Sequence, residues 1–132
     1  MAATPSSMIP LGTSAPDFKL LDTVSGREMS LADVKGKKGT VVMFICNHCP
    51  FVLNINEQLV KLGNEYLGKE IGFVAISSND VINYPQDRPE KMRTHAQSVG
   101  YPFPYLYDES QEVAKSYHAA CTPDFFLFDS DL

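Results

Sequence analysis

The sequence is poor in the features that mark nucleic-acid-binding and membrane proteins. Its 132 residues include 11 Lys and Arg against 16 Asp and Glu, which gives a formal net charge of -5 at pH 7. A chain with this charge has no basic surface for nucleic acid or for an anionic membrane, so neither is expected as a partner. No apolar run reaches the length of a membrane span, and residues 1–18 lack the basic and apolar segments of a secretory signal. We therefore expect a cytoplasmic protein.

Cysteine is also scarce, with three residues, and Trp is absent. Cys46 and Cys49 lie three positions apart in the stretch VVMFICNHCPFVLNI, and the third cysteine is Cys121. An odd number of cysteines in a reducing compartment argues against a framework of structural disulfides. A close pair in that setting is more often catalytic or metal-binding.

What the sequence does contain is an alternation of strand and helix patterns. Residues 1–16, rich in Thr, Pro and Ser, are expected to be a lead-in, and residues 17–132 to form one domain. The patterns predict, in chain order, a hairpin turning near Ser25-Gly26, a helical turn within 31–39, a buried parallel strand at 40–45, a helix from Phe51 that ends near Gly68, a strand at 71–78, a helix at 89–99, a short strand at 104–108, a short helix capped by Ser110 and a strand from Pro123. This order favours an α/β domain whose central sheet is covered on both faces.

The cysteine pair lies where the strand at 40–45 gives way to a helix. A thiolate at a helix start is stabilised by unpaired N–H groups and by the helix dipole, which lower a cysteine pKa from about 8.5 to roughly 3.5–7.5. Cys46 is the candidate nucleophile. Cys49, one helical turn away, is the candidate resolving thiol that closes the disulfide. A cationic His48 would stabilise the thiolate further, and Pro50 suits the first position of a helix.

Other interpretations of the pair stay open. The simplest is that both cysteines are small core residues, although the Asn-His between them makes this a poor fit. A different function would be a metal-binding or metal-delivery module, in which soft ligands hold zinc or Cu(I). Its ligands would be Cys46, Cys49, Cys121 and either His48 or His118. A scaffold without activity is the remaining alternative.

Further residues have two interpretations each. Cys121 is either a small buried residue or a third thiol of the site. His95 falls on a mostly polar helix face, which predicts a surface position, and His118 falls at a helix end, where a cation is favourable. Phe51 and Tyr101 are candidates for lining a substrate groove, although aromatic residues near 101–107 are expected mainly to pack.

The segments FICNHCPFV and CTPDFFLFD resemble the signatures of a thioredoxin-fold family, the peroxiredoxin-like AhpC/TSA (redoxin) proteins, over about residues 12–132. The resemblance implies a thioredoxin-like α/β fold with a central mixed sheet, helices on both faces and an N-terminal β-hairpin extension. It implies that Cys46 and Cys49 are the redox pair. It also implies that Pro123 is a cis-proline packed against the pair, and that Thr122 offers its backbone to an extended substrate.

The same resemblance implies an activity. The protein would be a thiol-disulfide oxidoreductase or thiol-dependent antioxidant that acts on protein disulfides or hydroperoxides. Electrons would come from a cellular thiol reductant such as thioredoxin or glutathione, and no organic cofactor is expected.

The sequence departs from the family pattern in two places. Peroxiredoxins carry Thr or Ser three residues before the reactive cysteine and an Arg late in the domain, whereas Met43 stands at the first place and no Arg follows Arg93. The pair is therefore more typical of a dithiol exchanger than of a dedicated peroxidase. Thioredoxin-type domains also continue with a further strand and a closing helix, which this sequence lacks. Either the sequence is a shortened version of a longer chain or another subunit covers this edge, and we expect residues 125–128 to leave an apolar strand edge that leads to homodimerisation or to marginal solubility.

Overall fold

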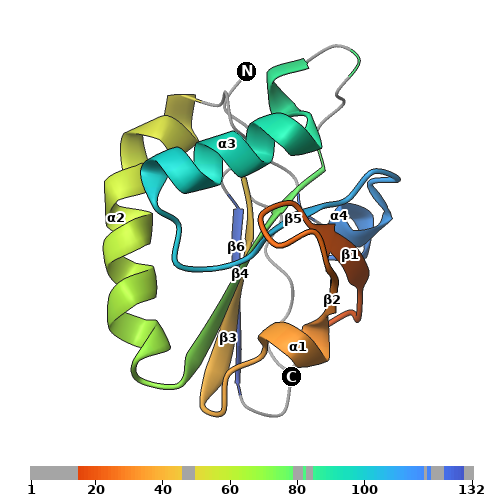
Figure 1. Cartoon of the computed structure of the whole chain (residues 1–132). Helices are drawn as coiled ribbons and strands as arrows, with labels where there is room; N and C mark the ends of the chain where they lie inside the picture. Colours follow the sequence, from red (N-terminus) through yellow and green to blue (C-terminus); the bar gives the residue numbers. More distant parts are fainter. Residues whose placement is uncertain are drawn as a thin grey trace.

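A mixed β-sheet crosses the computed structural model, with helices on its two faces (Figure 1). The structure describes residues 15–45, 50–78, 82, 85–117, 119 and 124–129. Within these residues the elements are, in chain order, β1 (Lys19–Asp22), β2 (Glu28–Ser30), α1 (Leu31–Val34), β3 (Gly39–Phe44), α2 (Pro50–Leu67), β4 (Ile71–Ser77), a 3-10 turn (Pro85–Asp87), α3 (Pro89–Val99), β5 (Tyr105–Tyr107), α4 (Glu112–Ser116) and β6 (Asp124–Asp129). The six strands of this described part follow the order β2-β1-β5-β4-β3-β6.

The central strands β3 and β4 are parallel and almost wholly buried. Their register joins Phe44 to Ile76, and residues 72–77 of β4 are all buried. Continuous apolar strands of this kind occur where helices cover both faces of a sheet. The predicted buried parallel strand at 40–45 is therefore confirmed.

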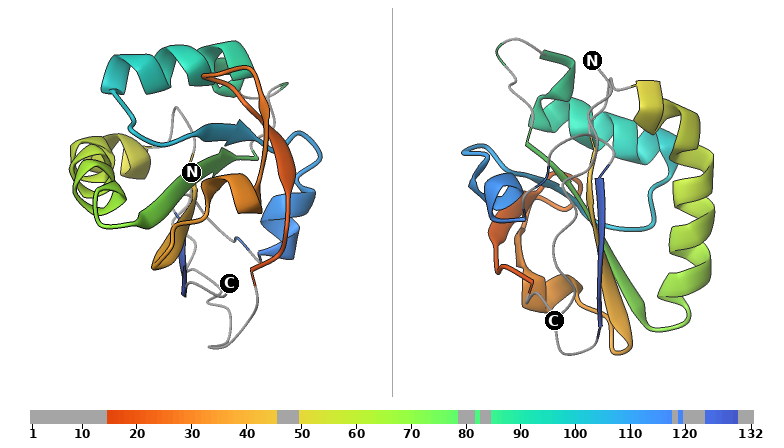
Figure 2. Two further views of the ribbon diagram at one scale, coloured as in Figure 1. Left: turned by 60° about the horizontal axis from the view of Figure 1, so that its bottom comes forward. Right: turned by 180° about the vertical axis from the view of Figure 1, so that it is seen from behind.

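The sheet divides the core into two clusters, because α2 and α3 cover one face and α1 and α4 cover the other (Figure 2). The α2/α3 core contains Met43, Ile45, Leu59, Phe73, Ala75, Met92, Ala96, Phe103 and Tyr105. The α1/α4 core contains Phe18, Leu31, Val34, Val42, Phe44, Val74, Ile76, Leu106, Tyr117, Phe126 and Phe128. Neighbouring strand residues alternate between the two cores, as the pleat of a strand requires. The predicted coverage of both faces is confirmed.

The N-terminal hairpin is fixed by the buried carboxylate of Asp22. It turns at residues 23–27, as predicted, with Gly26 in the left-handed conformation (φ 78°). Asp22 accepts hydrogen bonds from the Val24 and Ser25 amides and from the Ser25 hydroxyl, the last at 2.7 Å. Its Oδ1 also accepts the Tyr105 amide at 3.2 Å, so the same carboxylate joins the hairpin to β5.

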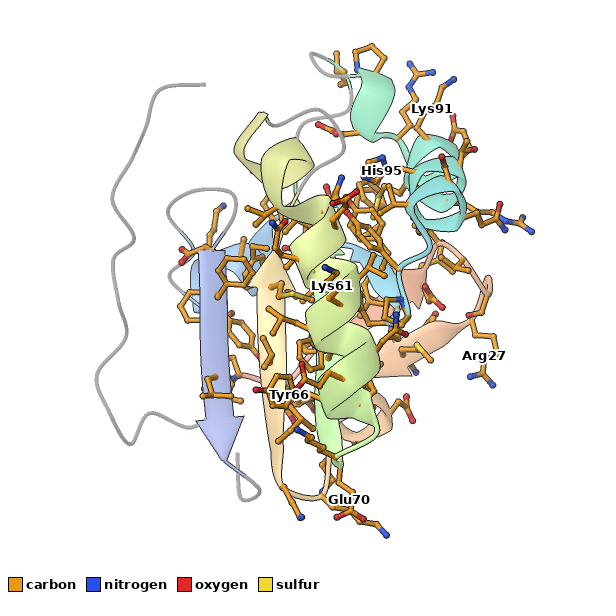
Figure 3. All side chains as sticks on the ribbon, turned by 90° about the vertical axis from the view of Figure 1, so that its left-hand side faces the viewer. Arg27, Lys61, Tyr66, Glu70, Lys91 and His95 are labelled. Atoms are coloured by element: carbon orange, nitrogen blue, oxygen red, sulfur yellow. The ribbon has the colours of Figure 1, made fainter. Side chains whose placement is uncertain are left out.

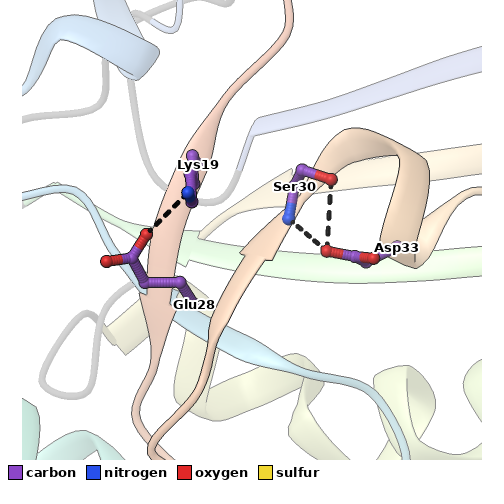
Figure 4. A network of polar contacts seen from close by, with 4 residues as sticks. All are labelled: Lys19, Glu28, Ser30 and Asp33. Atoms are coloured by element: carbon purple, nitrogen blue, oxygen red, sulfur yellow. Dashed lines mark hydrogen bonds and ion pairs between the residues drawn. The ribbon is translucent and has the colours of Figure 1, made fainter.

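Helix α1 is fixed at both of its ends. At its start the Ser30 amide donates to Asp33 Oδ2 at 2.8 Å (Figure 4), and this bond is the main cause of a lowered pKa of the Asp33 carboxyl. At its end the chain passes so close to β4 that a Cβ on Gly72 would overlap the Val34 carbonyl oxygen. Gly72 therefore has no room for a side chain. The exposed Lys19–Glu28 pair in the same view, 3.5 Å apart, adds little stability.

The start of α4 differs from the prediction. Gln111, in the left-handed conformation (φ 64°), precedes the helix as its N-cap residue. Ser110, the predicted cap, lies one residue before the N-cap residue and accepts the Glu112 amide on its hydroxyl oxygen at 3.3 Å. The reason is that Gln111 Nε2 donates to the Ser78 carbonyl at 2.8 Å, which anchors the loop to the end of β4.

Candidate active site

The predicted redox pair lies between two described elements. β3 ends at Phe44, Ile45 follows it with no exposed surface, and α2 begins at Pro50. The predicted junction of a buried strand and a helix is therefore confirmed. Residues 46–49, which include both cysteines and His48, lie outside the described residues, as do the side chains of the first turn of α2.

The second motif is joined to the first through the sheet. β6 pairs antiparallel with β3, and its first residue, Asp124, is the partner of Phe44. Residues 121–123, the predicted Cys-Thr-Pro loop, come directly before Asp124 and lie outside the described residues. Phe44 stands two residues before Cys46. The strand that leads into the first motif is thus paired with the strand that follows the second motif.

An aromatic cluster supports these strand ends from the α1/α4 side. The ring centroid of Tyr117 lies 5.5 Å from that of Phe44 and 5.8 Å from that of Phe126. Tyr117 has no exposed surface, and its hydroxyl donates a hydrogen bond to the Pro16 carbonyl at 2.6 Å. Burial raises the pKa of this phenol well above its ordinary value of 10.0, and the nearby Asp17 charge raises it further. One neutral side chain therefore ties the strand ends beside both motifs to the residues before the hairpin.

Several polar side chains lie close together where β4 and β5 end. The Ser78 hydroxyl donates to Asp108 Oδ2 at 2.7 Å, and the Ala114 amide donates to the same oxygen at 3.0 Å. Two buried atoms here, Ser77 Oγ and Asp108 Oδ1, have no hydrogen-bond partner in the described part of the chain. Sequence reasoning missed this group. The only available signal was a run of polar residues, beginning with two serines, at the end of a predicted strand.

A second polar cluster lies between α2 and α3, near the His95 label in Figure 3. The Tyr101 hydroxyl donates to Asn56 Oδ1 at 2.6 Å, and His95 Nε2 lies 3.2 Å from the Tyr101 oxygen. The same ring nitrogen lies 3.5 Å from Asn56 Nδ2, so His95, Tyr101 and Asn56 form one polar cluster. Burial lowers the pKa of His95, although the Asp87 charge opposes the shift. The predicted surface position of His95 is wrong, because the half-buried ring packs edge-on against Tyr101 at 5.6 Å.

Tyr101, a candidate for a substrate groove, is part of this interior cluster. Its ring stacks on Phe103 with centroids 4.9 Å apart, and its hydroxyl is bonded as described above. The other candidate, Phe51, lies in the first turn of α2, where side chains are not described. The interpretation of the aromatic residues near 101–107 as packing residues is the one that the contacts support.

An apolar groove runs between α2 and the edge strand β6, with a volume of about 330 Å³. It is lined by Val41, Met43, Leu59, Leu62, Tyr66, Ile71, Phe73, Phe125 and Leu127. Figure 3 shows Tyr66 on α2 over the sheet, with β6 at its margin. The predicted apolar edge is confirmed for Phe125 and Leu127, which are 46% and 75% exposed. It is wrong for Phe126 and Phe128, because alternate strand residues turn into the α1/α4 core.

Two expectations concern membranes and metals. Among the described helices, none is both long and apolar enough to cross a membrane. The described residues also contain no cluster of three His, Cys, Asp or Glu side chains that could hold a metal. The cysteine and histidine ligands of the metal-module interpretation all lie outside those residues, so that interpretation is untested.

Comparison with known proteins agrees with this geometry. A family model described as the AhpC/TSA family matches residues 11–132. The chain belongs to the AhpC/TSA family. A Mycobacterium tuberculosis relative, named provisionally as a peroxiredoxin, is 27% identical over 116 residues, which are 88% of this chain and 68% of the relative. AhpC/TSA membership and this relative support a redox function of the thioredoxin and peroxiredoxin kind.

Solved structures agree with the AhpC/TSA assignment. The crystal structure of an uncharacterized conserved protein from Geobacillus kaustophilus is 57% identical, with a TM-score of 0.98 over the whole of this chain and 70% of that one. The thioredoxin domain of a thiol-disulfide oxidoreductase from Bacteroides vulgatus, 22% identical, has a TM-score of 0.76 over 93% of this chain and 84% of its own. At that identity the second likeness shows the fold alone. The predicted thioredoxin-like fold and the family resemblance are both confirmed.

Proposed function

We propose that the protein is a thiol-disulfide oxidoreductase whose redox centre is Cys46 and Cys49. The observation that supports this most directly is the pairing of Phe44 with Asp124, which joins the chain leading into the cysteine pair to the chain leaving the Thr-Pro loop. A few residues cannot carry either motif far from these ends, since each residue spans at most about 3.3–3.6 Å. The nucleophile Cys46 and the Thr-Pro loop that presents a substrate would therefore lie close to each other.

In the proposed reaction the Cys46 thiolate attacks one sulfur of a substrate disulfide and forms a mixed disulfide, and the other substrate sulfur leaves as a thiolate. Cys49 then attacks the Cys46 sulfur, which releases the second substrate thiol and leaves the Cys46–Cys49 disulfide. The substrate has gained two electrons. A cellular thiol such as reduced thioredoxin or glutathione returns them by the reverse exchange.

Helix α2 supplies the electrostatic support for Cys46. It extends over 18 residues from Pro50, so its first turn carries unpaired N–H groups and the positive end of a long helix dipole. A thiolate just before this helix is stabilised over the thiol. His48 would add positive charge when protonated. Pro50 and Phe51 would shape the surface beside the sulfur.

The Cys-Thr-Pro loop is proposed as the substrate-binding element. Pro123 would be the cis-proline and Thr122 the backbone donor to an extended substrate. Cys121 is proposed as a third thiol that the first two do not require. The Cys121→Ser variant tests this role, because loss of disulfide reduction would transfer the resolving function from Cys49 to Cys121.

The structure favours disulfides over hydroperoxides as substrates. Met43, which stands where peroxiredoxins carry a polar residue, is 1% exposed and packed in the α2/α3 core. Arg88 and Arg93 are both exposed, at the start and on the outer side of α3. Hydroperoxide reduction would still balance chemically, since Cys46 would become a sulfenic acid as the O–O bond breaks and Cys49 would then expel water.

The proposal is tested by trapping the intermediate. Cys49→Ser is expected to accumulate a mixed disulfide at Cys46 when incubated with an oxidised peptide, and Cys46→Ser is expected to accumulate none. Peptide mass mapping of the mildly oxidised parent should find Cys46 and Cys49 joined, with the loss of two hydrogens. Insulin reduction should be faster than peroxide consumption at equal enzyme concentration. Equal trapping at both cysteines would refute the assigned roles.

We also propose that two copies associate through β6. Phe125 and Leu127 line the apolar groove from β6, which is an edge strand of the sheet that the structure describes, and an apolar strand edge favours pairing with another strand. Leu127→Lys should shift the mass measured by light scattering from dimer to monomer. Phe126→Leu, a buried and conservative change on the opposite face, is the matched control and should leave the dimer intact. A monomeric parent at high concentration would refute this interface.

A further inference from the structure

Three side chains from different segments form a polar contact between α2 and the end of α3. Asn56 belongs to α2, His95 to α3 and Tyr101 to the chain just after α3. The Tyr101 hydroxyl donates to Asn56 Oδ1 at 2.6 Å, and His95 Nε2 lies 3.2 Å from the Tyr101 oxygen and 3.5 Å from Asn56 Nδ2. One nitrogen of the half-buried histidine ring therefore lies beside polar groups of two other segments.

The packing around this contact is apolar. Met92 and Ala96 of α3 and Leu59 of α2 belong to the same core. Further along α2, a Cβ on Gly63 would lie 2.6 Å from Pro102 Cγ, so the helix packs directly against the chain that follows α3. None of these five residues changes its charge with pH. A pH dependence of the packing between α2 and α3 would therefore come from the polar contact.

A hollow of about 650 Å³ lies beside the polar contact. It is lined by Asn56, Glu57, Val60, Lys61 and Val99. The Asn56 side chain, of which residue 8% is exposed, thus contacts the His95 ring and also borders a space that water can enter.

The neutral form of His95 suits this contact better than the protonated form. Burial lowers the pKa of the ring, and the negative charge of Asp87, in the turn before α3, opposes the shift. A protonated ring carries N–H groups on both nitrogens, so Nε2–H would meet Asn56 Nδ2, which is itself a donor.

The other charged groups around His95 lie on the two helices. Glu57 and Lys61 of α2 line the hollow with opposite charges, and Lys91 lies one turn before His95 on α3. All three side chains are exposed, so solvent weakens their effect on the ring.

We propose that Asn56, His95 and Tyr101 form a pH-sensitive latch, which holds the end of α3 against α2 while His95 is neutral and releases it when the ring is protonated. This inference does not depend on the proposed redox function. A ring released into water regains its ordinary pKa of 6.5, so the released state takes up a proton more readily. The latch is consequently closed above that pH and weakens as the pH falls below it, by up to about tenfold per pH unit.

The test is hydrogen exchange of the whole chain between pH 7.5 and pH 5, followed by mass spectrometry and expressed as protection factors. The Gly100 and Tyr101 amides both donate to the Ala96 carbonyl, at 2.9 and 3.0 Å, so their exchange reports on the end of α3. Their protection is expected to fall by at least about threefold over this range, because local opening exposes them. The amides of β4, in the buried centre of the sheet, should keep their protection.

Variants show whether His95 is the titrating group. His95→Gln keeps a polar side chain without the titration, so its protection at the end of α3 should not depend on pH. The matched controls are His48→Gln and His118→Gln, which each remove another histidine of the chain and should retain the parental pH dependence. Tyr101→Phe removes one partner of the ring, and it should lower the protection already at pH 7.5.

The latch is overturned if the protection of the parent does not change with pH, or if the loss persists in His95→Gln. An equal loss of protection in β4 also overturns it, because acid would then be opening the whole fold. A titration of the parent by NMR needs no substitution and decides the question if His95→Gln does not fold. A measured pKa of His95 at or above 6.5 would mean that acid does not favour release, and the inference would fail.

Discussion

Tyr117→Phe removes a single hydroxyl from the centre of the molecule and leaves its ring in place. That hydroxyl donates to the Pro16 carbonyl at 2.6 Å, and the side chain has no exposed surface. Loss of a buried hydrogen bond of this kind costs about 1–2 kcal/mol of unfolding free energy, because the carbonyl loses its partner where water does not easily replace it. The ring contacts with Phe44, Phe126 and Phe128 are unaffected by the change.

The assay is urea unfolding of the parent, Tyr117→Phe and Tyr117→Ala at pH 7. The alanine variant should lose about 3–5 kcal/mol, since it also empties the space that the ring fills. A loss below about 0.3 kcal/mol for the phenylalanine variant, with an unchanged denaturant slope, would show that the hydroxyl bond contributes nothing in solution.

The pH dependence of the unfolding free energy, compared between the parent and Tyr117→Phe, gives an independent check. Burial raises the pKa of Tyr117, so the folded state favours the neutral phenol. A group whose pKa is raised on folding stabilises the protein fully below its unfolded pKa and loses that contribution as pH rises toward its folded value. The stability advantage of the parent over Tyr117→Phe should therefore change little below about pH 9 and grow smaller above about pH 10, where unfolded Tyr ionises. An advantage that increased with pH would contradict the assignment.

Two further predictions follow from described contacts. Burial lowers the pKa of His95 below its ordinary value of 6.5, so neutral His95 stabilises the fold above that pH and this contribution is lost as pH falls through the lowered pKa. The urea midpoint of His95→Gln should therefore fall less steeply between pH 7.5 and pH 5 than the urea midpoint of the parent. Parallel curves for the two proteins would rule out this account. Gly72→Ala should destabilise by at least about 2 kcal/mol because its Cβ would overlap the Val34 carbonyl oxygen, whereas Gly68→Ala, whose Cβ would meet the Glu65 carbonyl oxygen at an ordinary 3.6 Å, should change the thermal midpoint little.

The order of strands and helices could be predicted because it depends on local patterns. The apolar run at 40–45, the helical spacing after Phe51 and the Pro at position 89 each identify their element. The same patterns predicted a strand before residue 46 and a helix after residue 49, and the structure confirms both elements.

The errors concern contacts between residues distant in the sequence. Ser110 is a typical N-cap residue, and only the hydrogen bond of Gln111 to Ser78, 33 positions away, shows why the helix begins one residue later. His95 falls on a polar helix face, yet its ring contacts Tyr101 of the next loop and Asn56 of α2 and is half-buried. The Ser77 hydroxyl, which has no partner among the residues that the structure describes, could not be predicted either, because its surroundings depend on contacts between distant parts of the chain.

The antiparallel register of β6 against β3 limits how the chain can vary. Because side chains alternate strictly, deletion of Asp124 would turn Phe126 and Phe128 to the groove side and Phe125 and Leu127 inward, or else shift the register of β6 against Phe44. Insertions within the preceding loop would not change which side chains of β6 face inward. The spacing from the Thr-Pro to the first inward phenylalanine should thus be held constant among related sequences, even where the loop changes length.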